Sequence, residues 1–152
     1  MPHNPPPMAL DPDSLARLQQ ADPSLAKVLL LASSRTPFAW RIVEVARTIE
    51  KQREYFQAGR SKVNPDAYPD KNDLYRAAKH ITGPGMPTSR AADVAIVGAD
   101  PYHVPTLAYL AGVIRSCSVE LGIPIRWGGD FDQDGKLLEP GTFHDLPHFE
   151  RI

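Results

Sequence analysis

Histidines and carboxylates of the kinds that bind metals stand in two parts of this sequence. Near its end, residues 144–150 read HDLPHFE, so that His148 follows Asp145 closely. Together with His80 and Asp93 upstream, His148 completes a set of two histidines and one aspartate. Catalytic zinc binds three such side chains and keeps a fourth position for water, an arrangement that hydrolyses amide bonds at neutral pH. Asp145 would then be a spare carboxylate able to accept a proton.

The sequence contains five histidines, and they are not equal candidates for a metal ligand. His3 lies in a proline-rich segment and His103 in a turn before a helix, so both are discounted. The candidates that remain are His80, His144 and His148. A single polar residue at a strand end is more often hydrogen bonded than metal bound, because burial without a partner is costly. The metal interpretation is favoured only when the residues are taken jointly.

Hydrophobic periodicity, helix caps and turn residues predict the elements that must position these side chains. Helices are expected over residues 14–20, 24–32, 48–58 and 105–122, and strands over residues 41–47, 91–97, 123–127 and 148–152. In the last strand, His148 and Glu150 would share one face and Phe149 the other. Residues 61–88 are expected to be irregular, and such a long irregular stretch is more often functional than idle. The order of elements predicts an α+β fold, a small, mainly antiparallel sheet with helices packed on it.

Length and composition narrow the possible functions. The 152 residues suit one domain with a real core, preceded by a proline-rich arm at residues 1–10. The net charge of -1 gives no indication of a nucleic-acid partner. No apolar run is long enough to span a bilayer, and the N-terminus lacks a secretory pattern, so we expect cytoplasmic synthesis and no membrane embedding. The single cysteine, Cys117, has helical spacing with apolar residues and is expected to be buried.

Four blocks between about residue 38 and residue 150 carry a resemblance to a known family. They are VEVART at residues 43–48 with Gln52 and Gly59-Arg60, His80 with SRAAD at residues 89–93, LGIPIRWGGD at residues 121–130, and DLPHFE at residues 145–150. The last two blocks, in this order and at this separation, are the specific part. On these blocks the chain resembles the M15 zinc peptidases of the D-alanyl-D-alanine carboxypeptidase type, which include phage L-alanyl-D-glutamate endolysins. The resemblance implies a DD-peptidase or hedgehog-like fold, with residues 11–152 as one catalytic domain.

The resemblance also implies a role for each matching residue. His80, Asp93 and His148 would bind one zinc ion. Asp145 would be the general base toward the zinc-bound water, and Arg47 would bind substrate and stabilise charge on the attacked carbonyl oxygen. Zinc lowers the pKa of bound water to about 7, a positioned base contributes roughly a hundredfold or more, and a guanidinium fits an oxyanion better than an ammonium group does. The implied substrate is an amide bond in the stem peptide of bacterial peptidoglycan, cut by an endolysin-like endopeptidase or a carboxypeptidase.

The sequence departs from the family pattern between two of these ligands. His80 and Asp93 are 13 positions apart, more than the family usually has. We interpret the additional residues as a loop insertion at residues 83–88. Ser89 stands where the family block has glycine, and Ala78 where it has serine.

Two interpretations of the whole chain follow. An active peptidase would work on the bacterial cell wall, delivered by host lysis or as part of a phage virion, with virion or tail proteins as further partners. The alternative is a catalytically inactive module that keeps the fold within a virion or tail assembly, where the proline-rich arm would dock onto a partner. Metal content and wall hydrolysis separate the two.

Residues 130–135, with the sequence DFDQDG, have the spacing of a calcium loop. Asp130, Asp132 and Asp134 would supply carboxylates at alternate positions, with a glycine at the turn. The twelfth position is not the glutamate of an EF-hand, and no helices are expected on either side. Two interpretations stay open: an acidic surface turn, or a calcium site that holds the loop carrying Asp145 and so regulates activity.

Overall fold

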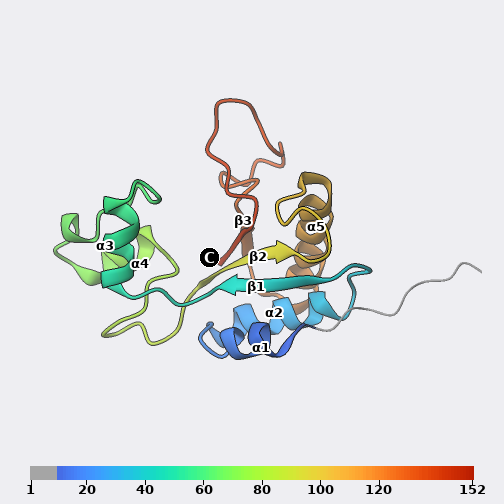
Figure 1. Ribbon diagram of the computed structural model, residues 1–152, viewed down its shortest axis with the longest axis horizontal. Helices are drawn as coiled ribbons and strands as arrows, with labels where there is room; N and C mark the ends of the chain where they lie inside the picture. The colour runs from blue at the N-terminus through green and yellow to red at the C-terminus, as the bar shows by residue number, and fades with distance from the viewer. Residues whose placement is uncertain (1–9) are drawn as a thin grey trace, which may run out of the picture.

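The chain folds into α-helices and one small sheet, described for residues 10–152 in a computed structural model. The elements are α1 (Pro12–Leu18), α2 (Pro23–Ser33), β1 (Trp40–Glu44), α3 (Ile49–Gln57), the short 3-10 helix η1 (Pro65–Ala67), α4 (Lys71–Ala77), β2 (Ala91–Ile96), α5 (Val104–Leu121), β3 (Ile125–Trp127) and β4 (His148–Arg151). Figure 1 shows the sheet at the centre, α1, α2 and α5 beside it, and α3 and α4 set to one side. The predicted α+β class is confirmed, and the predicted elements all form, with bounds that differ by up to three residues.

The sheet has the strand order β1-β2-β4-β3, and every neighbouring pair is antiparallel. The last strand of the sequence, β4, therefore lies inside the sheet, between β2 and β3. This position gives the His148 end of the chain two hydrogen-bonded neighbours. It also brings β1, β2 and β4, which are far apart in the sequence, next to one another in the sheet.

Side-chain caps explain where the helices begin. Asp22 accepts a hydrogen bond from the backbone N–H of Ser24 at 2.9 Å, and Pro23 occupies the first helical position, where no N–H is needed. Thr48 accepts from the N–H of Lys51 at 3.1 Å and begins α3 as expected. α5 ends at Gly122, whose φ of 66° is left-handed and favours glycine.

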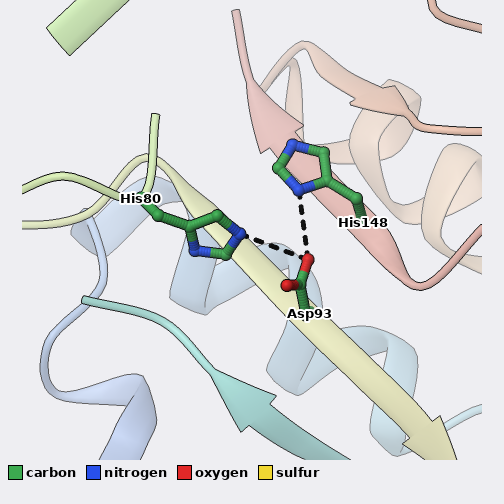
Figure 2. Close-up of side chains that lie close together, drawn as sticks. All are labelled: His80, Asp93 and His148. Atoms are coloured by element: carbon green, nitrogen blue, oxygen red, sulfur yellow. Dashed lines mark hydrogen bonds and ion pairs between the residues drawn. The ribbon is translucent and has the colours of Figure 1, made fainter. Parts of the chain in front are cut away.

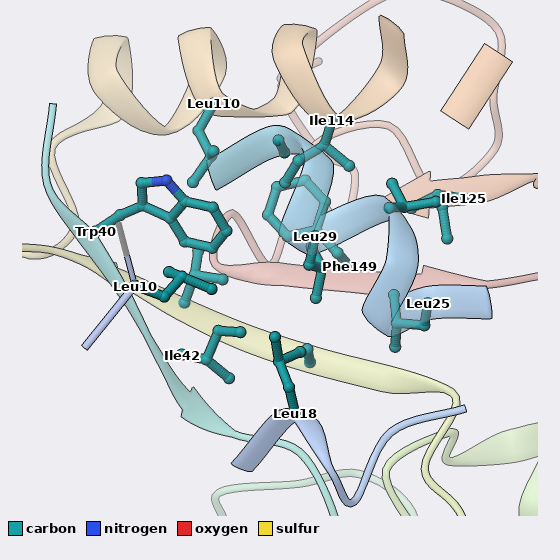
Figure 3. Packing of buried hydrophobic residues seen from close by; sticks show 14 of the residues in the cluster. Leu10, Leu18, Leu25, Leu29, Trp40, Ile42, Leu110, Ile114, Ile125 and Phe149 are labelled. Atoms are coloured by element: carbon teal, nitrogen blue, oxygen red, sulfur yellow. The ribbon is translucent and has the colours of Figure 1, made fainter. Parts of the chain in front are cut away.

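The hydrophobic core lies between one face of the sheet and the helices α1, α2 and α5. Alternate strand residues point into it, among them Ile42, Val94 and Phe149, all of which are fully buried. Figure 3 shows Phe149 and Ile125 packed under α2 and α5. Burying a side chain of this size contributes about 1.5–3 kcal/mol. Because strand residues alternate, the opposite face of the same strands is free to carry polar groups.

The prediction of an entirely irregular stretch at residues 61–88 is wrong in part. The stretch contains η1 and α4, and Asp70 caps α4 by accepting from the N–H of Asn72 at 2.9 Å. With seven residues, α4 is too short to show a clear periodicity in the sequence. It forms because Leu74 and Tyr75 pack with Ile81 into a second small core beneath α3 and α4.

Three further expectations concern parts of the chain away from the sheet. Cys117 is buried in the main core, as predicted. The predicted proline-rich arm lies outside the described residues except for Leu10, whose side chain packs in the core. Among residues 10–152, no helix combines the length and the apolar character needed to cross a membrane.

Candidate active site

A row of polar side chains crosses the face of the sheet opposite the core. In the strand register, Glu44 stands next to Asp93, and Asp93 next to His148. Glu44 reaches this position because the register of β1 shifts between Ile42 and Glu44, which indicates a β-bulge. A bulge re-aims the side chains that follow it. The sheet thus places three functional groups from β1, β2 and β4 side by side.

His80, Asp93 and His148 converge on one point, as Figure 2 shows. Asp93 Oδ1 lies 3.2 Å from His80 Nε2 and 3.1 Å from His148 Nδ1. One ligand atom from each residue lies within 4.8 Å of the others. Ligands of a tetrahedral zinc ion, about 2.0–2.1 Å from the metal, lie roughly 3.3 Å from one another. The spacing and the donor types therefore suit such an ion.

Hydrogen bonds on the outer side of each ring select the nitrogen that faces the cluster. His80 Nδ1 lies 2.7 Å from the carbonyl oxygen of Val45, which can only accept, so this nitrogen donates and Nε2 faces Asp93. His148 Nε2 lies 2.9 Å from Glu150 Oε1, so its Nδ1 faces the cluster. Partners of this kind orient metal-binding imidazoles and fix their tautomers.

Asp93, Glu150 and His148 strongly shift each other's pKa values. Burial raises the pKa of Asp93, but hydrogen bonds with His148 and His80 outweigh it and hold that pKa well below its usual range. Burial lowers the pKa of His148, yet its bonds to Asp93 and Glu150 raise it to about 9. Burial raises the pKa of Glu150, while His148 and Arg126 lower it to about 2. Without a metal, the cluster therefore holds an imidazolium between two carboxylates at neutral pH.

Glu150 joins the cluster to the neighbouring strand. Its side chain is 7% exposed, and its second oxygen accepts from Arg126 Nη2 at 2.8 Å. Lys79 Nζ lies 3.9 Å from the same oxygen. Because the carboxylate is held from both sides, Glu150 can keep the His148 ring in one orientation.

These pKa shifts predict how the stability of the metal-free protein depends on pH. The lowered pKa of Glu150 contributes stability above about pH 4.5, which is lost as the pH falls through about 2. The raised pKa of His148 contributes stability below about pH 6.5, which is lost as the pH rises through about 9. Thermal unfolding of the metal-free protein should therefore show its highest Tm between these limits, about pH 4.5 to 6.5. Glu150→Gln should reduce the acid-side slope, to which Asp93 also contributes, whereas exposed Glu54→Gln should leave it unchanged; a wild-type Tm that is flat with pH would contradict the prediction.

Asp145 lies on the loop between β3 and β4 and faces the same cleft as the cluster. Its N–H donates to the carbonyl of Gly128 at 2.8 Å, and its carbonyl accepts from the N–H of His148 at 3.0 Å. Burial, followed by the charge of Asp93, raises the pKa of the Asp145 carboxyl, which His148 and other cations oppose. A carboxylate with a raised pKa is a better proton acceptor near neutral pH.

Gly128 sets the position of the Asp145 backbone. A Cβ atom at residue 128 would lie 1.8 Å from the Asp145 carbonyl oxygen, so any side chain must displace the loop. Since a misplacement of about 1 Å can cost about a hundredfold in rate, we expect Gly128→Ala to lower kcat by roughly that factor. Gly112→Ala on α5 is the matched control, because its Cβ meets nothing within 4 Å. Steady-state kinetics on a stem peptide would measure both, and an unchanged kcat for Gly128→Ala would contradict the expectation.

Arg47 lines the cleft with a side chain that is only 12% exposed. Its Nη1 donates to Gln52 Oε1 at 2.9 Å, and its Nη2 donates to Glu44. Its guanidinium lies 4.6 Å from the ring centroid of Tyr55, whose hydroxyl donates to Glu44 at 2.9 Å. Arg47 is therefore held rigidly at the edge of the site.

An open cleft of about 980 Å³ lies above the polar face of the sheet, whose residues form its floor. One wall comes from the region of α3 and α4, and the other from the loop between β3 and β4. Among the described residues that line it, none belongs to the inserted residues 83–88, so the insertion does not cover the site. These residues instead turn back on themselves, and Tyr75 donates to the carbonyl of Pro84 at 2.8 Å.

The other histidines do not join the cluster in the described residues. His144 lines the cleft, but its Nε2 lies 2.7 Å from Thr142 Oγ1. His103 is exposed at the start of α5 and lies 2.7 Å from Thr106 Oγ1. His3 falls outside the described residues.

The acidic loop brings Asp130, Asp132 and Asp134 together, with one carboxylate oxygen of each within 4.8 Å of the others. Asp130 Oδ2 accepts from the N–H of Gly135 at 3.2 Å, as in a tight turn. Lys136 Nζ lies 4.0 Å from Asp134 and supplies a competing positive charge. The geometry is compatible with both interpretations, and calcium binding stays a prediction.

Three residues around the cluster had no assigned role in the sequence analysis. They are Glu44, Tyr55 and Arg126, which orient Arg47 and Glu150. The alternation of polar and apolar residues in β3 was the available signal for Arg126. No comparable signal existed for Glu44, because its position depends on the bulge in β1.

Comparisons with known proteins identify the family of the chain and its fold. The model of the family described as phage L-alanyl-D-glutamate peptidase matches residues 8–152. The fold is similar to the crystal structure of the Serratia marcescens L-Ala D-Glu endopeptidase ChiX, with a TM-score of 0.70, 24% identity, and coverage of 96% of this chain and 91% of that chain. No protein of curated function gives a match. The M15-type resemblance and its fold are thereby confirmed, and the chain belongs to the phage L-alanyl-D-glutamate peptidase family.

Proposed function

We propose that this protein is a zinc-dependent endopeptidase that hydrolyses the L-alanyl-D-glutamate bond in the stem peptide of bacterial peptidoglycan. The observation that carries the proposal is the convergence of His80, Asp93 and His148 at the floor of an open cleft that Asp145 also lines. Membership in a family of peptidoglycan peptidases supports the substrate class. The same membership does not favour the alternative of an inactive virion or tail module.

The ligand set fits zinc in three ways. Two imidazole nitrogens and one carboxylate are the ligands that catalytic zinc takes, with a fourth position left open. His80 and His148 each have an outer hydrogen bond that turns one nitrogen toward the cluster. Asp93 lies between them with its pKa held low, so its carboxylate is ionised and ready to bind a cation.

The remaining residues divide the chemistry among them. Bound zinc would lower the pKa of water and polarise the substrate carbonyl. Asp145 accepts the proton of the attacking water and later delivers it to the leaving nitrogen of D-glutamate. Arg47, held by Glu44 and Gln52, stabilises the negative charge that develops on the carbonyl oxygen. Glu150 keeps the His148 ring oriented throughout.

The direct test uses purified cell walls and added zinc. The wild-type protein should reduce the turbidity of the walls, and mass spectrometry of the products should find new amino termini on D-glutamate. Cleavage at another bond would keep the peptidase assignment and change the specificity. The proposal would be refuted if the turbidity of the walls fell no faster with the wild-type protein than with His148→Ala.

Calcium provides a separate test of the acidic loop. If Asp130, Asp132 and Asp134 bind calcium, millimolar calcium should raise the activity and Tm of wild type, because it would hold the loop that leads to Asp145. Asp132→Asn with Asp134→Asn should then abolish that response without removing zinc. An acidic surface turn predicts no effect of calcium on either protein.

We also propose that the protein reaches the cell wall through host lysis or as part of a virion. The description of the family as phage L-alanyl-D-glutamate peptidase supports this route. Detection of the protein in purified virions by mass spectrometry would distinguish a tail or virion component from an enzyme released at lysis.

A further inference from the structure

Two of the positively charged side chains in the cleft differ from the others in having no carboxylate partner within the described part of the chain. Seven lysine and arginine side chains line it: Arg47, Arg60, Lys62, Arg76, Lys79, Arg126 and Lys136. Five of them form ion pairs with neighbouring carboxylates. In residues 10–152, Arg60 and Lys62 are the two cleft cations with no carboxylate at ion-pair distance. Their charge is therefore available to a ligand.

The turn that carries both cations is well ordered by hydrogen bonds. The N–H groups of Arg60 and Ser61 donate to the Tyr55 carbonyl at 2.8 and 3.2 Å. Ser61 Oγ accepts from Gln52 Nε2 at 2.9 Å, and Gln52 is completely buried. The same Gln52 accepts from Arg47. Gln52 thus links this turn to Arg47, which lies at the edge of the candidate metal site.

Each cation rests on an aromatic ring and keeps its hydrogen-bond donors. The Arg60 guanidinium lies 4.3 Å from the ring centroid of Tyr55, and Lys62 Nζ lies 5.5 Å from that of Phe143. Contacts of this kind orient a cation without neutralising it. Phe143 in turn stacks on Phe131, and Phe131 lies 5.9 Å from the ring of His148. The two cations therefore border the space that leads to the cluster.

The substrate of the proposed reaction carries a matching charge. Hydrolysis of an L-alanyl-D-glutamate bond in a stem peptide releases the amine of D-glutamate, whose side-chain carboxyl continues the peptide. Its α-carboxylate is consequently free, on the leaving side of the scissile bond. Guanidinium and ammonium groups bind carboxylates through charge-assisted hydrogen bonds.

Resting on the proposed function, we propose that Arg60 and Lys62 form a specificity site for a carboxylate on the leaving side of the stem peptide. The carboxylate is either the α-carboxylate of D-glutamate or one on a later stem residue. Arg47 keeps its separate role at the carbonyl oxygen, because its terminal nitrogens donate to Gln52 and Glu44, whereas the proposed site uses the cations that have no carboxylate partner among the described residues. The site selects acidic stem peptides over amidated ones.

The test compares matched synthetic stem peptides by kcat/KM. One pair contains D-glutamate or D-isoglutamine, and a second pair has a third residue with or without a terminal carboxylate. In one of the two pairs, the kcat/KM of wild type should be about tenfold to a hundredfold higher for the peptide with the carboxylate than for its partner without it, as expected for a charge-assisted hydrogen bond. Arg60→Gln with Lys62→Gln should lose that preference and keep its rate on the amidated peptide. The control, Lys27→Gln, changes an exposed cation on α2 outside the cleft and should behave as wild type.

The pair that shows the preference identifies which carboxylate is bound. Wild type that cleaves all four peptides equally, or a double variant that keeps the full preference, would overturn this inference and leave the peptidase intact. Failure of wild type to cleave any of them would refute the proposed function, and this inference with it. Both replaced residues are exposed, so the variants should match the Tm of wild type.

Discussion

Replacing His148 with alanine is expected to abolish hydrolysis and the binding of one equivalent of zinc. His148 is one of the three converging residues proposed as zinc ligands and is itself held by Asp93 and Glu150, so its loss would remove a ligand and free both carboxylates. Metal ions contribute several kcal/mol to charge stabilisation in such reactions. Since each 1.4 kcal/mol is tenfold, activity should fall by a factor on the order of a thousand or more. Elemental analysis and stem-peptide hydrolysis measure the two effects.

A matched control and a chelation experiment complete this prediction. His103→Ala removes an exposed histidine at the start of α5 and should keep wild-type zinc content and rate. Chelation should inactivate wild type, and added zinc should restore its activity but not that of His148→Ala. The assignment of His148 would be wrong if its alanine variant kept one equivalent of zinc and the full rate.

Replacing Asp145 with asparagine should produce a different result, a slow enzyme that still binds zinc. The amide matches the carboxylate in shape, and the backbone bonds of Asp145 to Gly128 and His148 do not involve its side chain. Only proton acceptance is lost. General base catalysis contributes about a hundredfold to ten-thousandfold, so kcat should fall within that range.

The zinc content separates this outcome from loss of the site. Asp145→Asn should bind one equivalent of zinc, unlike His148→Ala. As a control, Asp100→Asn changes an exposed aspartate that caps the turn before α5, and its kcat should be unchanged. A wild-type rate in Asp145→Asn would exclude Asp145 as the base and point to another carboxylate of the cleft.

Much of the secondary structure was predictable because its determinants are local. Asp22-Pro23 and Thr48 mark helix starts through side-chain caps, and alternating residues in β4 separate Phe149 from its polar neighbours. α4 was not predictable by the same rules, because it is short and depends on packing with Ile81. Tertiary contacts, rather than local propensity, stabilise such a helix.

The sequence by itself determined which residues have the right chemistry for a metal and which elements carry them. It also contained the motifs by which the family is recognised, since the order and spacing of residues 121–130 and 145–150 are properties of the chain. The tertiary structure decided which groups meet. The insertion of β4 between β2 and β3 sets His148 beside Asp93, and the bulge in β1 sets Glu44 on the other side. Strand order, register and the free charge of Arg60 and Lys62 depend on contacts between distant segments, and a local pattern contains no information about them.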